Sequence, residues 1–156
     1  MRLRRPEAHE LPILSELCLR SKAVWGYDQA FLDACRAELT IRAEELDSTV
    51  LCVAEHDGAL VGVAQIIVHG DSADLNKMFV EPSAIGLGSG KALFEWVVEA
   101  AKGLGVKRLT IDAEPAAAGF YRKMGAIEHG LVPSGSIPGR MLPHFRIEFE
   151  ATAPGV

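Results

Sequence analysis

Three alternate glycines mark the segment of this chain whose residue types and spacing point most directly to chemistry. Gly86, Gly88 and Gly90 lie between an apolar stretch that ends at Pro82 and a long amphipathic stretch that begins near Ala92. Glycine leaves backbone N–H groups uncovered, and the first turn of a helix carries unpaired N–H groups with a partial positive charge. This arrangement predicts a loop that binds an anion, with phosphate as the natural ligand.

Two common phosphate-binding loops do not fit the spacing. A Walker-type loop requires glycine at the position of Ile85 and a hydroxyl residue at the position of Ala92. A dinucleotide-binding G-x-G-x-x-G pattern that starts at Gly86 meets Lys91 in place of its third glycine. We therefore expect neither a nucleoside triphosphatase nor a dinucleotide-binding enzyme.

The composition indicates one ordinary folded domain. Of the 156 residues, 49% are hydrophobic and 24% are charged, and the net charge is -5 at neutral pH. A nucleic-acid-binding protein usually carries the opposite charge. No apolar stretch approaches the roughly 20 residues that span a bilayer. We therefore expect neither nucleic acid nor a membrane among the partners.

Because the basic residues Arg2, Arg4 and Arg5 are followed by Glu7 and not by an apolar signal segment, we also expect a cytoplasmic location.

The cysteines and histidines lack the spacing of metal ligands. Cys18, Cys35 and Cys52 are isolated, with no Cys-x-x-Cys pair, and the five histidines show no His-x-His or His-Glu-x-x-His pattern. We therefore expect no metal site, and we interpret the cysteines as small buried hydrophobic residues.

The hydrophobic pattern of the N-terminal half predicts helices first and strands afterwards. After a short strand within 1–5, apolar residues at helical spacing predict one helix, and Asp28 predicts the N-cap of a second. The inward faces of the two helices comprise Leu11, Leu14, Leu17, Cys18 and Ser21, and then Phe31, Leu32, Cys35 and Leu39. Three neighbouring antiparallel strands are expected next, over 49–54, 59–68 and 73–80, with an Asp57-Gly58 turn joining the first two.

The C-terminal half predicts one parallel crossover. A long helix follows the glycine loop and ends near Gly103, and the strand over 106–112 should lie parallel to the strand over 73–80. The remaining elements are a short helix over 116–124 and strands over 126–132 and 145–150, separated by a loop over 133–143. The predicted fold is an α/β protein of the α+β type, with a mixed, mostly antiparallel sheet flanked by helices. We expect a single domain over 1–152 and a C-terminal tail over 153–156.

The glycine loop resembles the acetyl-CoA-binding motif of the GNAT superfamily of N-acetyltransferases. In that motif Val-x-Pro leads to Arg/Gln-x-x-Gly-x-Gly/Ala and a helix, and this chain has Val80-Glu81-Pro82 followed by Ile85-Gly86-Leu87-Gly88-Ser89-Gly90. The segment over 118–126, which contains Phe120-Tyr121, looks like the family's Phe-Tyr-x-x-x-Gly-Phe/Ala segment. The predicted order of elements is similar to the family's splayed fold over nearly the whole chain. The departures are Ile85, where the family has Arg or Gln, and 114–117, which lacks a common Asn.

The resemblance implies that an acetyl group passes directly from acetyl-CoA, as cosubstrate, to a primary amine in a ternary complex. The main chain of the strand that ends at Val80 would pair with the pantetheine arm, and the glycine loop would hold the pyrophosphate. The residues that the resemblance assigns to cofactor binding are Met78, Phe79, Val80, Ile85, Gly86, Leu87, Gly88, Ser89, Gly90, Lys91 and Tyr121.

An amine that attacks a thioester must first lose a proton. An amine with a pKa of about 10.4 is neutral in only about 1 molecule in 2,500 at pH 7, so a base is needed. The candidate bases are three carboxylates, in the order Asp74, Glu81 and Glu114, with a water relay as a further route. Asp74 occupies a position similar to the family's glutamate base. Tyr121 matches the family's general-acid tyrosine, which would protonate the departing thiolate.

The acceptor amine is the least defined part of the prediction. Trp25, Tyr27 and Arg140 are candidate contacts for a small-molecule or peptide amine, although each has an ordinary structural interpretation as a core aromatic or a surface arginine. Sheet edges at the C-terminal strands could support a homodimer. An alternative function is a non-catalytic module that binds or senses acyl-CoA, which would suit Ile85 and the missing Asn.

Overall fold

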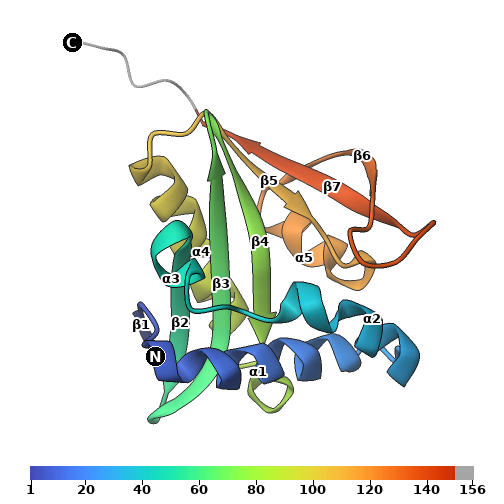
Figure 1. Cartoon of the computed structure of the whole chain (residues 1–156). Coiled ribbons are helices and arrows are strands. Elements are labelled where there is room, and N and C mark those ends of the chain that lie inside the picture. The colour runs from blue at the N-terminus through green and yellow to red at the C-terminus, as the bar shows by residue number, and fades with distance from the viewer. Residues whose placement is uncertain (150–156) are drawn as a thin grey trace.

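One seven-stranded sheet, in the order β1-β2-β3-β4-β5-β7-β6, runs through the protein (Figure 1). The computed structural model describes residues 1–149. The strands are β1 (Arg2–Arg4), β2 (Val50–His56), β3 (Ala59–His69), β4 (Ser72–Val80), β5 (Arg108–Asp112), β6 (Ile127–Pro133) and β7 (Met141–Glu148). Neighbouring strands are antiparallel except for β4 and β5, which are parallel. The predicted fold class is confirmed. The tail expected over 153–156 lies outside the described residues.

Helices cover both faces of the sheet. They are α1 (Leu11–Ala23), α2 (Gln29–Leu39), α3 (Glu45–Ser48), α4 (Ser89–Gly103) and α5 (Ala118–Lys123), with short 3-10 turns at Ala8–Glu10, Pro82–Ala84 and Pro115–Ala117. One buried cluster joins α4 and α5 to the sheet, and the other joins α1 and α2 to the opposite face. Figure 1 shows α1 and α2 on one side, with α4 and α5 on the other.

The helix predictions hold where they rest on local signals. Leu11, Leu14, Leu17 and Cys18 are buried on α1, as their spacing predicts. Asp28 caps α2, because its carboxylate accepts a 2.8 Å hydrogen bond from the Phe31 N–H. All three cysteines are buried and free.

Two elements differ from the sequence predictions. The short helix α3 was not expected, because a single turn leaves no periodic pattern to read. Strand β7 begins at Met141 and includes Pro143, whereas the prediction placed 133–143 in a loop. The proline is tolerated there because its carbonyl still accepts a 2.8 Å hydrogen bond from the Ala113 N–H, and because it lies just past the Asp112–His144 pair, where the pairing with β5 ends. Glu150, the predicted end of this strand, lies outside the described residues.

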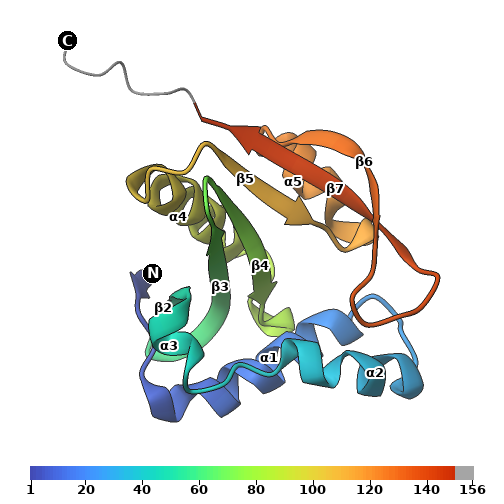
Figure 2. The ribbon, with the colours of Figure 1, turned by 45° about the horizontal axis from the view of Figure 1, so that its top comes forward.

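The sheet opens between β4 and β5. These strands pair only from Ser72 to Asp74, and then diverge while α1 and α2 cross the open end (Figures 1 and 2). A bulge in β4 accompanies the opening, since Gln65 of β3 faces Lys77 while Ile66 faces Leu75, which leaves Asn76 as the extra residue. A bulge bends its strand and increases the local twist, so β4 turns away from β5 at this point.

Gln65 fixes the bulge with a fully buried side chain. Its oxygen accepts hydrogen bonds from Asn76 Nδ2 at 2.8 Å and from Lys77 Nζ at 3.1 Å. Its Nε2 donates to Glu45 Oε1 and to Thr49 Oγ1, both at 3.1 Å. The buried amide therefore has partners on both of its polar atoms, which avoids the free-energy cost of an unsatisfied buried group.

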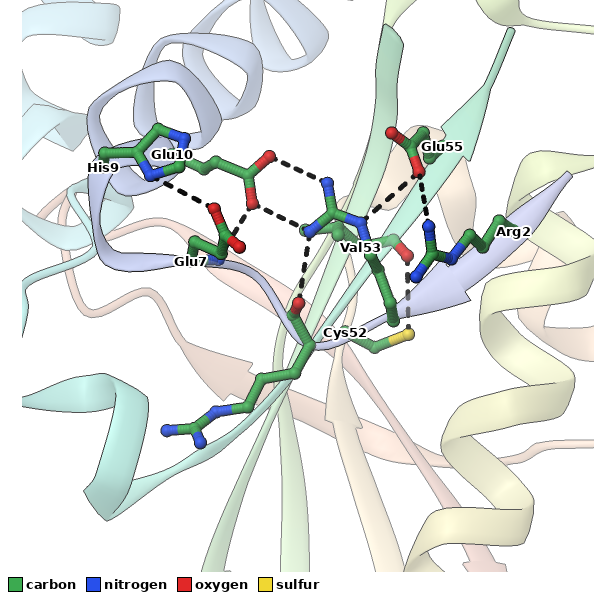
Figure 3. Close-up of polar contacts among 9 residues, drawn as sticks. Arg2, Glu7, His9, Glu10, Cys52, Val53 and Glu55 are labelled. Atoms are coloured by element: carbon green, nitrogen blue, oxygen red, sulfur yellow. Dashed lines mark hydrogen bonds and ion pairs between the residues drawn. The ribbon is translucent and has the colours of Figure 1, made fainter. Parts of the chain in front are cut away.

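An ion cluster at the edge of the sheet ties the N-terminal segment to β2 (Figure 3). Glu10 accepts two hydrogen bonds from the Arg4 guanidinium, at 2.8 and 2.9 Å, and one from the Glu7 N–H at 2.8 Å. Arg4 also donates to Glu55 of β2 at 3.4 Å. The hydrogen bonds from Arg4 lower the pKa of Glu10 from 4.5 to about 2.

We predict that Glu10→Gln lowers the free energy of unfolding at pH 7 and that the deficit shrinks on acidification. Because the pKa of Glu10 is depressed in the folded protein, its stabilisation is present above pH 4.5 and is lost as the pH falls towards about 2. Urea unfolding of both proteins at pH 7, 5 and 3 measures this trend. Glu99→Gln, which alters an exposed pair with Lys102, is the control. An equal deficit at pH 7 and pH 3 would contradict the prediction.

Candidate active site

A cavity of about 310 Å³ lies where β4 and β5 diverge. Its wall on the α4–α5 side includes Met78, Val80, Gly90, Ala117, Phe120 and Tyr121. Its wall on the α1–α2 side includes Ser21, Lys22, Trp25, Glu38, Lys77 and Phe79. Because residues from both faces of the sheet line one space, the cavity passes through the sheet between the two strands.

One edge of β4 is open to the cavity. The strand pairs with β3 along its whole length, but its pairing with β5 ends at Asp74. Within residues 1–149, no strand pairs with the β5-facing edge of β4 from Asn76 to Val80. An extended ligand could therefore add to this edge through main-chain hydrogen bonds, as a further strand would.

The predicted anion loop has the required backbone geometry. Gly86 and Gly88 have φ angles of 99° and 81°, a left-handed region that favours glycine, and Gly88 is the N-cap of α4. The Ala92 N–H makes the first backbone hydrogen bond of the helix, to the Gly88 carbonyl at 3.0 Å. No backbone carbonyl of residues 1–149 accepts from the amides of Gly86, Gly88, Ser89, Gly90 and Lys91. These five donors are available to a ligand.

The side chains of the loop divide between solvent and interior. Ile85 and Leu87 are 64% and 50% exposed, and Lys91 lies on the surface, 3.9 Å from Glu95. Ser89 is buried, and its hydroxyl has no hydrogen-bond partner among residues 1–149. An orphaned hydroxyl beside five unpaired amides fits a loop that binds an anion.

Tyr121 lines the cavity from α5 and is buried. Its ring makes edge contacts with Phe94 and Phe120 and a tilted contact with Phe145, at centroid distances of 5.3 to 6.0 Å. Burial raises the pKa of the Tyr121 hydroxyl well above its ordinary value, because the apolar surroundings disfavour the phenolate. The side chain therefore keeps its proton at neutral pH and can donate it.

The structure separates the three candidate bases. Glu81 binds Arg20 with both oxygens, at 3.0 and 2.6 Å, and does not line the cavity. Asp74 accepts from the Thr110 hydroxyl and lies 3.0 Å from His69 Nε2, beside a smaller cavity of about 110 Å³. Glu114 lines the main cavity.

Glu114 belongs to a cluster that connects α1 and α2 to the loop between β6 and β7. It accepts a hydrogen bond from the Tyr27 hydroxyl, lies 3.3 Å from Arg140 Nη2, and lies 3.8 Å from Lys22 Nζ. The Arg140 guanidinium covers the rings of Tyr27 and Phe31, which stack at 3.9 Å. Of the predicted acceptor contacts, Trp25 lines the cavity directly, while Tyr27 and Arg140 hold Glu114 at its wall.

Other polar residues of the cavity were not identified from the sequence. Lys22, Glu38, Lys77 and Asp112 all line it. Lys77 is 4% exposed, and burial lowers its pKa. The alternation of β5, in which Leu109 and Ile111 are buried on one face, places Asp112 on the other and could have indicated it. Nothing local indicated Glu38, because it lies on the exposed side of an amphipathic helix.

A match to a protein-family model establishes the family of this chain. Residues 47–125 match the family model of the acetyltransferase (GNAT) domain. The chain belongs to the GNAT acetyltransferase family. The matched range contains β4, the glycine loop and Tyr121, so the resemblance noted in the sequence is confirmed. Serotonin N-acetyltransferase 2, chloroplastic, from Oryza sativa subsp. japonica is 48% identical over 46 residues, which are 30% of this chain and 23% of that protein. The match thus spans less than a quarter of that relative's length.

Two solved structures show how widely the GNAT fold is shared. The PaiA N-acetyltransferase from Thermoplasma acidophilum, in complex with coenzyme A, has a TM-score of 0.80 and 16% identity, covering 95% of this chain and 98% of its own. The ribosomal-protein-S18-alanine N-acetyltransferase from Escherichia coli has a TM-score of 0.72 and 17% identity, covering 99% and 97%. At these identities the likeness establishes the GNAT fold alone.

Residues 1–149 hold neither a cluster of metal ligands nor a membrane-spanning helix. No group of three or more His, Cys, Asp or Glu side chains in this range is placed to hold a metal ion. No helix in the same range is long and apolar enough to cross a bilayer.

The two tyrosines of the GNAT chain provide a test of the cavity wall. Burial and the hydrogen bond to Glu114 raise the pKa of Tyr27 to about 12, and burial also raises the pKa of Tyr121, the other tyrosine of the chain. We predict that a spectrophotometric titration shows no tyrosinate near pH 10 while the protein is folded. Glu114→Gln should lower the pKa of Tyr27 and leave the pKa of Tyr121 unchanged. Glu128→Gln, which alters a surface pair with Arg122, should change neither. Titration of both wild-type tyrosines near pH 10 would contradict the described cluster.

Proposed function

We propose that this protein transfers an acetyl group from acetyl-CoA to a primary amine, directly, in a ternary complex. The observation that carries the proposal is the cavity through the sheet, because it gives two substrates separate approaches to one point. The glycine loop and Tyr121 lie on one side of that point, and most of the charged side chains lie on the other. Direct transfer requires both substrates to be bound together in reacting geometry, which such a passage allows.

Main-chain groups supply most of the proposed acetyl-CoA site. The unpaired amides of the loop over 86–91 would hold the pyrophosphate, and the open edge of β4 at Met78, Phe79 and Val80 would pair with the pantetheine arm. Ile85 and Leu87 expose apolar surface beside the loop. The coenzyme A complex of the Thermoplasma acidophilum relative supports this proposal, since its chain aligns over nearly all of this one.

Proton transfer would use groups on both walls. Tyr121, protonated because it is buried, would donate to the CoA thiolate as the carbon–sulfur bond breaks. The amine would lose its proton to a carboxylate or through water, and Asp74, Glu81 and Glu114 are the candidates named from the sequence. Of these three, Glu114 is the one that lines the main cavity.

The proposed acceptor is a small-molecule amine or a peptide amine. Trp25 offers an apolar wall at the α1–α2 side, and Glu38, Asp112 and Glu114 offer carboxylates that attract a cationic amine. The named acceptors of the relatives, serotonin and a ribosomal protein alanine, are suitable members of a test panel. A homodimer through β6, which is an edge strand, is also proposed.

A pair of glycine variants tests the role of the loop. Gly88 and Gly105 both have positive φ angles, 81° and 75°, and a Cβ added at either would have no atom within 4 Å. Gly88→Val and Gly105→Val should therefore lose similar stability, about 1–2 kcal/mol. We predict that Gly88→Val abolishes CoA binding in calorimetry, because its side chain occupies the approach to the amides, while Gly105→Val binds CoA like the wild type. Equal affinities for all three proteins would exclude the loop as the pyrophosphate site.

An acetylation screen tests the proposed function as a whole. The protein is incubated with acetyl-CoA and a panel of amines that includes serotonin and an alanine-initiated peptide, and CoA thiol release is followed together with product mass. We expect release that depends on one class of amine. Binding of CoA without thiol release across the panel would favour the acyl-CoA-sensing alternative. Absence of CoA binding would contradict both functions.

Tyr121→Phe tests the proton donor. We predict a loss of roughly 10 to 1,000-fold in kcat with nearly unchanged CoA affinity, as expected when one proton-transfer partner is removed. Phe94→Leu, which alters the packing around the ring without removing the hydroxyl, controls for a structural effect. Unchanged turnover of Tyr121→Phe would remove Tyr121 from the mechanism.

A further inference from the structure

Asp112 occupies the last position of β5, at the mouth of the opening in the sheet. Asp112 lines both the main cavity and the smaller cavity of about 110 Å³ that adjoins it. The side chain is 55% exposed, so a ligand in either cavity can reach it. Asp112 is therefore accessible from the cavity in which acetyl transfer is proposed.

His144 of β7 holds this carboxylate in place. Its Nδ1 lies 2.7 Å from Asp112 Oδ1, and the Arg146 Nε–H donates to its Nε2 at 3.1 Å. Because Nε2 accepts that hydrogen bond, Nδ1 carries the ring proton and donates to Asp112. The imidazole side chain is 13% exposed. The three residues thus form a hydrogen-bonded series from Arg146 through His144 to Asp112 Oδ1. The other carboxylate oxygen, Asp112 Oδ2, forms no hydrogen bond or ion pair within residues 1–149.

The other acidic candidates have stronger competing partners. Glu81 uses both oxygens on Arg20, and Glu114 lies among Tyr27, Arg140 and Lys22. Asp74 is bound to Thr110 and His69 and does not line the main cavity. A base must keep a lone pair free and lie within reach of the proton that it removes. Asp112 keeps Oδ2 without a partner within residues 1–149 and lines the main cavity.

We propose that Asp112 is the proton acceptor for the attacking amine and that His144, fixed by Arg146, is its positioning residue. This inference rests on the proposed acetyl transfer. The ammonium of the acceptor gives one proton to Asp112, and the freed lone pair forms the carbon–nitrogen bond as the carbon–sulfur bond breaks. The thiolate leaves with a proton from Tyr121, and the second proton of the nitrogen passes to solvent as the amide forms. Tyr121 and Asp112 then return to their starting states by exchange with water.

Glu38 is the rival to this assignment. It lines both cavities from α2, and it has no ion pair within 4 Å among residues 1–149. Unlike Asp112, it has no hydrogen-bond partner in that range to fix its rotamer, and a flexible glutamate makes a poorly positioned base. The charged groups around Asp112 are His144 and Arg146 on β7, Asp74 and Lys77 on β4, Glu38 on α2, Lys22 on α1, and Glu114 just after β5.

The test compares pH profiles of acetyl transfer for wild type, Asp112→Asn, Glu38→Gln and the surface control Glu99→Gln. We expect Asp112→Asn to lower kcat at pH 7 by roughly 100 to 1,000-fold, with the KM for acetyl-CoA changed less than about threefold. The loss should shrink by about tenfold per pH unit as the pH rises towards the amine pKa, because the amine then arrives already deprotonated. A merely structural defect would not depend on pH in this way.

Two variants test the role of His144. Asn can place an N–H donor near the position of the imidazole Nδ1, whereas Leu cannot. We expect His144→Asn to keep kcat within about threefold of the wild type and His144→Leu to lose roughly 10 to 100-fold. The loss of the Leu variant should shrink with pH as that of Asp112→Asn does.

The outcomes separate the role of Asp112 from the acetyl transfer itself. If wild type releases no thiol with any amine, both the proposed function and this inference fail. If wild type is active and Asp112→Asn keeps its activity, or its loss is the same at every pH, the inference fails and the proposed function stands. A larger loss in Glu38→Gln, with a pH-dependent profile, would transfer the role to Glu38.

Discussion

The structure depends on the loss of pairing between β4 and β5 beyond Asp74. Interrupting a sheet leaves main-chain groups without partners, and such groups are unfavourable unless something else satisfies them. Here the interruption is held open by a bulge at Asn76, and the bulge is fixed by the buried amide of Gln65, which bonds to Asn76, Lys77, Glu45 and Thr49. The cavity, the open edge of β4 and the lining of the cavity by residues from both faces of the sheet all follow from this one interruption.

The opening also separates two kinds of chemistry. On the α4–α5 side the available groups are backbone amides and a tyrosine whose apolar surroundings keep it protonated, which suits an anionic ligand and a leaving thiolate. On the α1–α2 side the groups are mostly ionisable, including Glu38, Lys22 and Asp112. Because the sheet lies between the two sets, the proposed function would let a cationic acceptor and an anionic cosubstrate bind without competing for the same charges.

Much of the fold could be predicted from the sequence because its signals are local. The Asp57-Gly58 turn has φ angles of 51° and 81°, as a tight hairpin of this composition requires, and Asp28 caps α2 through its own carboxylate. The glycine loop could be recognised because Gly86 and Gly88 must adopt left-handed conformations close to a helix start.

The rest of the candidate site depends on contacts between distant segments. Arg140 reaches Tyr27 across 113 positions of sequence, and His144 reaches Asp112 across 32. The sequence pattern does not indicate which strand lies beside β5. In the structure it is β7, and this pairing places His144 next to Asp112. Carboxylates could therefore be named as a class, but their partners, and hence their availability as bases, could not.

The most direct test of the central claim is an amide chemical-shift titration of the ¹⁵N-labelled protein with coenzyme A. We expect the largest perturbations on the amides of Gly86, Gly88, Ser89, Gly90 and Lys91 and on those of β4 from Asn76 to Val80. Saturable binding that leaves these amides unperturbed, with shifts confined to other parts of the protein, would contradict the claim.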